Sequence, residues 1–167
     1  MTIDHKYGVP TVAVHTDRFE AVVRSVTQVS GMPYMRQVFV PQPVMGKTPQ
    51  QLRAYIDGTD PITGRPVMQE VIEGLTRPLD DEDLKQITFE RSTPRLDTLN
   101  GKTVYLVDCR FDDSDIFLKQ MQGWFEEHMP GVRTRFIQIR NVYTKDDPET
   151  WQEIKEHGDA AIIGVGH

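Results

Sequence analysis

The sequence is nearly free of cysteine and has no long apolar run. Its 167 residues include one cysteine, Cys109, which excludes an intrachain disulfide and metal clusters built from cysteine pairs. No apolar run reaches the roughly 18 residues that a transmembrane helix needs. Residues 1–6 also lack the apolar core of a secretory signal. We therefore expect a cytoplasmic protein that does not bind membranes.

Basic residues are fewer than acidic ones and are not clustered. The chain has 19 Lys and Arg residues against 25 Asp and Glu residues, a net charge of -6. Nucleic-acid binding needs basic residues that cluster on one face of the protein. Arg133, Arg135 and Arg140 instead alternate with apolar residues, which indicates the solvated side of a strand. The sequence therefore predicts no nucleic-acid partner.

The overall composition is that of a globular protein. Hydrophobic residues make up 38% of the chain and aromatic residues 8%. A chain of this length is typical of one domain with a core large enough to fold without crosslinks. The polar segment 77–98 divides the sequence into halves 1–76 and 99–167. We expect a single α/β domain, residues 1–167, in which this segment joins two halves.

The first half alternates between strand and helix signals. The β-branched run 9–15 is typical of a buried strand. Thr16 is a candidate N-cap for the helix that follows. The apolar stripe of that helix consists of Phe19, Val22, Val23 and Val26. Three further elements are predicted: a strand at 37–40 and helices at 48–57 and 67–75.

The second half repeats this alternation. Strands are predicted at 103–108, 134–139 and 159–165, with helices that begin at 112–114 and at 147. One short helix is expected in the connection, at 81–86. Strands that alternate with helices favour a parallel sheet with helices on both faces. The two halves resemble each other in element order.

Chemistry in such a fold is expected at one edge of the sheet. Ligands of open α/β sheets bind beyond the carboxyl ends of the strands. The polar and glycine residues at the predicted strand ends are therefore the candidates. The candidate catalytic residues are His15, Cys109 and His167, and the candidate substrate-binding residues are Thr16, Gln42, Gly164 and Gly166.

Each candidate has a functional and a structural interpretation. The Cys109 thiol, close to a helix start, could act as a nucleophile, or it could be a small packing residue. His15 and His167 could transfer protons if their strands are neighbours, or they could be structural. Two histidines alone make a poor zinc site. Gly164 and Gly166 lack the third glycine and the following helix of a dinucleotide site, so neither a metal nor a cofactor is expected.

Four stretches of the chain resemble the UGSC-type selenocysteine/cysteine family. Residues 7–14 and 39–46 resemble the part after the redox motif, where a G-(I/V)-P-x-V strand precedes a P-H-P-(L/I)-x-G loop. Residues 99–108 and 159–166 resemble the part before it, where G-V-G-(D/H) leads into the selenocysteine or cysteine. The chain is also similar to the selenocysteine-containing B subunit of glycine, sarcosine and betaine reductases. The resemblance covers most of the chain, in permuted order.

The chain departs from the family pattern at two points. Gln42 stands where the family has the histidine of P-H-P, and the redox motif expected after Gly166 and His167 is missing. Cys109 matches a loop of the family and not the motif. The resemblance thus implies thiol or selenol chemistry on a small polar metabolite. It also implies that a second protein subunit supplies the cysteine-bearing segment of a composite site.

Three functions follow from these observations. The first is a subunit of a heteromeric cysteine-dependent enzyme, a lyase or an oxidoreductase that cleaves or reduces a carbon–heteroatom bond. In that enzyme, N–H groups after Thr16 hold a substrate carboxylate. The second is a catalytically silent partner that stabilises or regulates the cysteine-bearing subunit. The third is a racemase or isomerase, which would need a thiol from each half, whereas the sequence has one cysteine.

Overall fold

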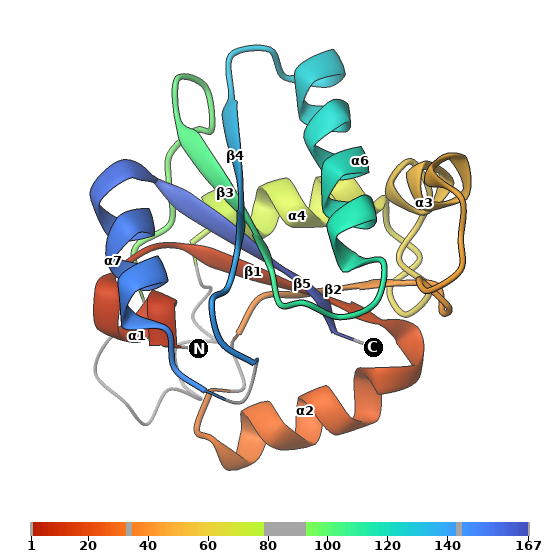
Figure 1. Cartoon of the computed structure of the whole chain (residues 1–167), viewed down its shortest axis with the longest axis horizontal. Helices are drawn as coiled ribbons and strands as arrows, with labels where there is room; N and C mark the ends of the chain where they lie inside the picture. The colour runs from red at the N-terminus through yellow and green to blue at the C-terminus, as the bar shows by residue number, and fades with distance from the viewer. Residues whose placement is uncertain (1, 33–34, 79–92, 143–144, 167) are drawn as a thin grey trace.

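The computed structural model describes residues 2–32, 35–78, 93–142 and 145–166, and its described part contains a five-stranded sheet (Figure 1). The strand order is β2-β1-β5-β3-β4, and all neighbouring strands are parallel. The expected α/β fold with a parallel sheet is therefore confirmed. The strands are β1 (Thr11–Thr16), β2 (Gln37–Val40), β3 (Thr103–Asp108), β4 (Arg133–Gln138) and β5 (Ala160–Gly166).

Helices cover both faces of this sheet. Three of them, α3 (Pro49–Ile56), α4 (Val67–Thr76) and α6 (Ser114–His128), pack on one face, here called the α6 face. The helices α1 (Thr2–Tyr7) and α7 (Pro148–His157) pack on the other, the α7 face. Because successive strand residues point to opposite faces, β3, β4 and β5 contribute to both cores, whereas β1 and β2 contribute to the core of the α6 face.

The predicted helix starts at residues 48 and 147 are confirmed by their capping hydrogen bonds. Thr48 and Gln51 form a reciprocal capping box: the Gln51 N–H donates to Thr48 Oγ1 at 3.3 Å and the Thr48 N–H donates to Gln51 Oε1 at 3.0 Å. At α7, the Asp147 carboxylate accepts from the Thr150 N–H at 3.3 Å. Both caps satisfy backbone donors that the helix itself leaves unpaired.

The helix after β1 differs from the prediction. A 3₁₀ turn, η1 (Asp17–Phe19), comes first, Thr16 caps it with no side-chain hydrogen bond, and α2 (Glu20–Val29) follows. An apolar stripe is ordinarily the face that a helix turns to the core. In α2, however, Val22 and Val26 are exposed, Val23 is half-buried and Thr27 is buried. Most of the predicted apolar stripe of α2 thus faces away from the sheet.

Three further points complete the comparison with the sequence. Helix α1 was not predicted, because its six residues carry a weak pattern. The helix expected at 81–86 lies outside the described residues. Strands of both predicted halves join one sheet, while the similarity of the halves remains a prediction. Among the described residues, no helix has the length and apolar character needed to cross a membrane.

Two glycines within helices provide a test of the packing. A Cβ at Gly74 of α4 would lie 2.5 Å from Val12 Cγ2 of β1, whereas a Cβ at Gly123 of α6 would meet only Arg53 Nη1, at 4.0 Å. We expect Gly74→Ala to lower the free energy of unfolding by about 1–3 kcal/mol through overpacking. Gly123→Ala should raise it by up to about 1 kcal/mol through helix propensity. Urea titration of both variants checks this, and equal effects would contradict the close approach of α4 to β1.

Candidate functional site

The two candidate residues at the end of β1, His15 and Thr16, point to opposite faces of the sheet. His15 pairs in register with Phe39, and the two ring centroids lie 6.1 Å apart on the α7 face. Thr16 pairs in register with Val40, which belongs to the core on the α6 face. Thr16 is fully buried there, and its hydroxyl has no hydrogen-bond partner. The two side chains therefore do not line the same pocket wall.

His15 is the best-formed functional group at this edge. Its Nε2 is buried and has no hydrogen-bond partner. Burial lowers the pKa of His15 to about 4, so the imidazole is uncharged at neutral pH. Buried polar atoms are nearly always paired in folded proteins, and an unpaired one at the carboxyl edge of a sheet is a natural contact for a ligand.

Gly166 of β5 allows this position of the His15 ring. The two residues pair across the sheet at a register irregularity, and a Cβ at residue 166 would lie 2.7 Å from His15 Nδ1. Any side chain there would push the imidazole aside. The structure therefore brings together two residues that the sequence singled out, and it gives Gly166 a positioning role toward His15.

Helix α2 presents polar groups to the strands beside His15. The Arg24 guanidinium lies 5.9 Å from the Phe39 ring centroid and donates to Glu20 Oε1 at 2.6 Å. The Thr27 hydroxyl accepts from Gln37 Nε2 at 3.5 Å. Phe39 thus contacts both the histidine of β1 and a cation of α2. Polar groups of α2 thus contact the α7 face of β2 both at Phe39 and at Gln37, the first residue of the strand.

A serine at the start of α6 fixes the end of β5. Ser114 is fully buried, and its hydroxyl donates to the Gly164 carbonyl at 2.9 Å and accepts from the Val165 N–H at 2.7 Å. The Cys109 N–H also donates to the Gly164 carbonyl, at 3.2 Å. The peptide bond between Gly164 and Val165 is cis. The Gly164 carbonyl therefore already accepts two hydrogen bonds from within the protein.

The sequence indicated a helix cap near Ser114 but not this contact. Its partner lies 50 residues further along the chain. Only the arrangement of α6 beside β5 brings the two together. No local sequence signal could have found this residue.

Cys109 lies in surroundings that keep its thiol protonated. Burial, followed by the nearby charge of Asp108, raises the pKa of Cys109 to about 12. The Asp108 carboxylate itself accepts from the Arg110 N–H at 2.8 Å and from Gln138 Nε2 at 2.7 Å. The thiol packs against the apolar cluster of the α7 face. Because the thiolate is the nucleophilic form, this geometry favours the packing interpretation of Cys109.

The remaining candidates are dispersed along the edge. The Gln42 N–H donates to Asp17 Oδ1 at 3.0 Å, and the Gln42 side chain is exposed. His167 lies outside the described residues. His15 lies in β1 and Cys109 directly follows β3. These strands flank β5, so the two residues are separated by roughly two strand spacings, about 10 Å. The structure thus unites His15 with Gly166 but does not pair the thiol with the imidazole.

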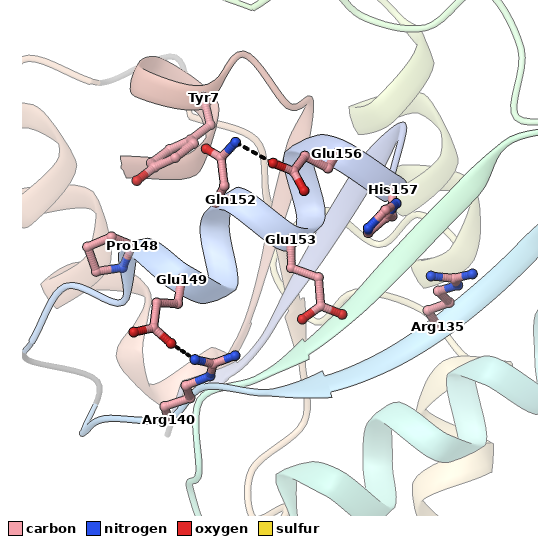
Figure 2. Close-up of a pocket in the computed structure, with 9 residues that line it drawn as sticks. All are labelled: Tyr7, Arg135, Arg140, Pro148, Glu149, Gln152, Glu153, Glu156 and His157. Atoms are coloured by element: carbon pink, nitrogen blue, oxygen red, sulfur yellow. Dashed lines mark hydrogen bonds and ion pairs between the residues drawn. The ribbon is translucent and has the colours of Figure 1, made fainter.

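A wide hollow of about 820 Å³ lies elsewhere, between α7 and the exposed strand β4 (Figure 2). Two of its charged groups, Arg140 and Glu149, form an ion pair. In the described ranges, no group of three or more His, Cys, Asp or Glu side chains is placed to hold a metal. The hollow is lined by Tyr7, Arg135, Arg140, Pro148, Glu149, Gln152, Glu153, Glu156 and His157.

The parallel sheet, with polar and glycine residues at the carboxyl ends of its strands, makes this an α/β protein. Within that class the chain belongs to the UGSC family, whose model matches residues 4–62 and 66–167. The family resemblance seen in the sequence is therefore confirmed. The permuted order and the relation to the reductase B subunit stay predictions. No curated protein and no solved structure matches the chain.

The state of the thiol can be tested by alkylation. With its pKa raised to about 12, Cys109 should react with iodoacetamide at pH 8 far more slowly in the folded chain than in the urea-unfolded chain. Mass spectrometry of the alkylated protein over time measures both rates. Equal rates would show that the thiol is accessible and ionised like a free cysteine.

The buried imidazole predicts a specific pH dependence of stability. An unfolded His15 titrates near pH 6.5 and the folded one near pH 4, so the unfolded chain binds more protons between these values. The stabilisation is complete above pH 6.5 and is lost as the pH falls toward 4, by on the order of 3 kcal/mol. We expect His15→Asn to flatten this dependence in urea titrations. An unchanged slope in that variant would contradict the assignment.

Proposed function

We propose that this chain is one subunit of a heteromeric enzyme and contributes His15 to a composite active site. The observation that carries the proposal is the buried, uncharged His15 imidazole with an unpaired Nε2 at the carboxyl edge of the sheet. An uncharged imidazole accepts a proton at one nitrogen and donates from the other. It suits a general acid–base role, or a hydrogen bond that orients a polar substrate.

The reactive thiol of this enzyme comes from a second protein. The UGSC family resemblance implies thiol or selenol chemistry, and the one cysteine of this sequence is held protonated. A cysteine-bearing segment that approaches the ends of β1 and β5 would meet the His15 imidazole. The unprotonated Nε2 of that histidine would then accept a hydrogen bond from the thiol and orient it toward the substrate.

The substrate of the proposed site is a small polar metabolite. The reaction is cleavage or reduction of a carbon–heteroatom bond, which makes the assembly a lyase or an oxidoreductase. The N–H groups after Thr16 offer hydrogen-bond donors for a substrate carboxylate. A cytoplasmic location belongs to this proposal.

One observation favours a second function, that of a silent stabilising or regulatory partner. At this edge the Gly164 carbonyl, the Val165 N–H and the Gln42 N–H are all bound within the chain. Backbone groups that are bound within the chain keep this edge in one shape, against which another subunit can pack. A racemase or isomerase is less consistent with the site. Such an enzyme needs one thiol from each half, whereas this chain has a single cysteine, whose thiol is protonated.

Activity of the assembled complex separates these functions. The chain is co-expressed with the product of the neighbouring reading frame, and turnover is measured for the complexes of His15→Asn, Cys109→Ser and His157→Asn. We expect His15→Asn to lower kcat by roughly 100-fold or more, as loss of a general acid–base group does. Cys109→Ser should stay near the wild type.

His157→Asn is the matched control, because His157 is an exposed histidine of α7. Full activity in all three variants would establish the silent partner. A chain that is active alone as a monomer would overturn the composite site. Each complex is first checked for intact assembly by size-exclusion chromatography.

A further inference from the structure

Helix α2 exposes three of its four valines, and its one buried side chain is that of Thr27. Val22, Val26 and Val29 are 56%, 57% and 90% exposed, whereas Thr27 is 5% exposed. In Figure 1, α2 lies along the outside of the molecule, next to the carboxyl end of the sheet. A helix that served only to cover the sheet would present the opposite face. The described residues of a single copy therefore leave this stripe exposed.

The outward stripe has the spacing of a helix-pairing seam. Phe19, Val22, Val26 and Val29 follow one another at steps of three, four and three residues. This is the a/d spacing by which two helices interlock their side chains. The steps read the same in both directions. In an antiparallel pair of identical helices, Phe19 would therefore lie opposite Val29 and Val22 opposite Val26, which is the self-complementary contact of a two-fold dimer.

The segment that carries this stripe has no net charge. Helix α2 and the preceding turn hold two acidic residues, Asp17 and Glu20, and two basic ones, Arg18 and Arg24, while the whole chain has a net charge of -6. Glu20 and Arg24 pair with each other at 2.6 Å. Two copies that meet through this face therefore avoid the repulsion that the net charge of the chain imposes on other approaches.

We propose that α2 pairs in antiparallel orientation with α2 of a second copy of this chain. The pairing buries the stripe from Phe19 to Val29 in a two-fold interface. Ten helical residues extend about 15 Å, and a contact of that length buries less than the roughly 800 Å² per partner of a standard interface. The dimer is accordingly reversible and depends on concentration. This inference goes beyond the proposed function and does not rest on it.

Sedimentation equilibrium of the full chain tests the proposal at concentrations from about 1 to about 500 µM. The wild type should pass from monomer to dimer over this range. Val26→Glu places an unpaired carboxylate in the seam and should raise the dimer dissociation constant by roughly tenfold or more. The matched control is Gln28→Glu, which adds the same charge to an exposed position of α2 outside the stripe. It should dimerise like the wild type.

Folding is monitored separately from association. Because Val26 is 57% exposed in a single copy, Val26→Glu should keep the circular dichroism and the melting temperature of the dilute wild type. If it does not, Val26→Ser, which carries no charge, takes its place and should also weaken the dimer. A wild type that stays monomeric at all concentrations, or a dimer that both Val26 variants leave intact, overturns the proposal. The measurement needs neither partner nor substrate, so its failure is distinct from that of the composite site.

Discussion

The structure depends on β5, the central strand of the sheet. β5 pairs with β1 on one edge and with β3 on the other, and it is the element that joins the strands of the two halves into a single sheet. Its residues from Ala160 to Val165 are buried, so it contributes to the core on both faces. Its end is held by the Ser114 hydroxyl and approaches the His15 ring at Gly166. The position of the candidate site therefore follows from the position of this strand.

Most of the fold follows from local signals in the sequence. Alternation of β-branched strands with capped helices predicted the strands and the helix starts at Thr48 and Asp147, because these signals depend on neighbouring residues alone. These local signals did not predict which way the apolar stripe of α2 faces. Hydrophobic periodicity shows that a helix has an apolar side, but not whether the core or the surface receives it.

The candidate site was predicted in location more accurately than in chemistry. The rule that ligands bind at carboxyl ends of parallel strands led to His15 and Gly166, which the structure brings together. The state of Cys109 could not be read from the sequence, because the pKa of a thiol depends on burial and on charges that only the folded chain assembles. Likewise, nothing local indicates that Ser114 holds Gly164 across 50 residues.

The two outer strands of the sheet differ in how they meet solvent. β4 carries Arg133 and Arg135, whose guanidinium groups reach back to the Gly101 carbonyl at 2.8 Å and to the Tyr105 hydroxyl at 3.2 Å. A strand of a neighbouring molecule that added to β4 would have to strip water from these charges. Exposed cations along an edge strand are a known defence against such addition. The arginines of β4 thus act as gatekeepers against edge-to-edge aggregation, while β2 limits the same hazard by its shortness.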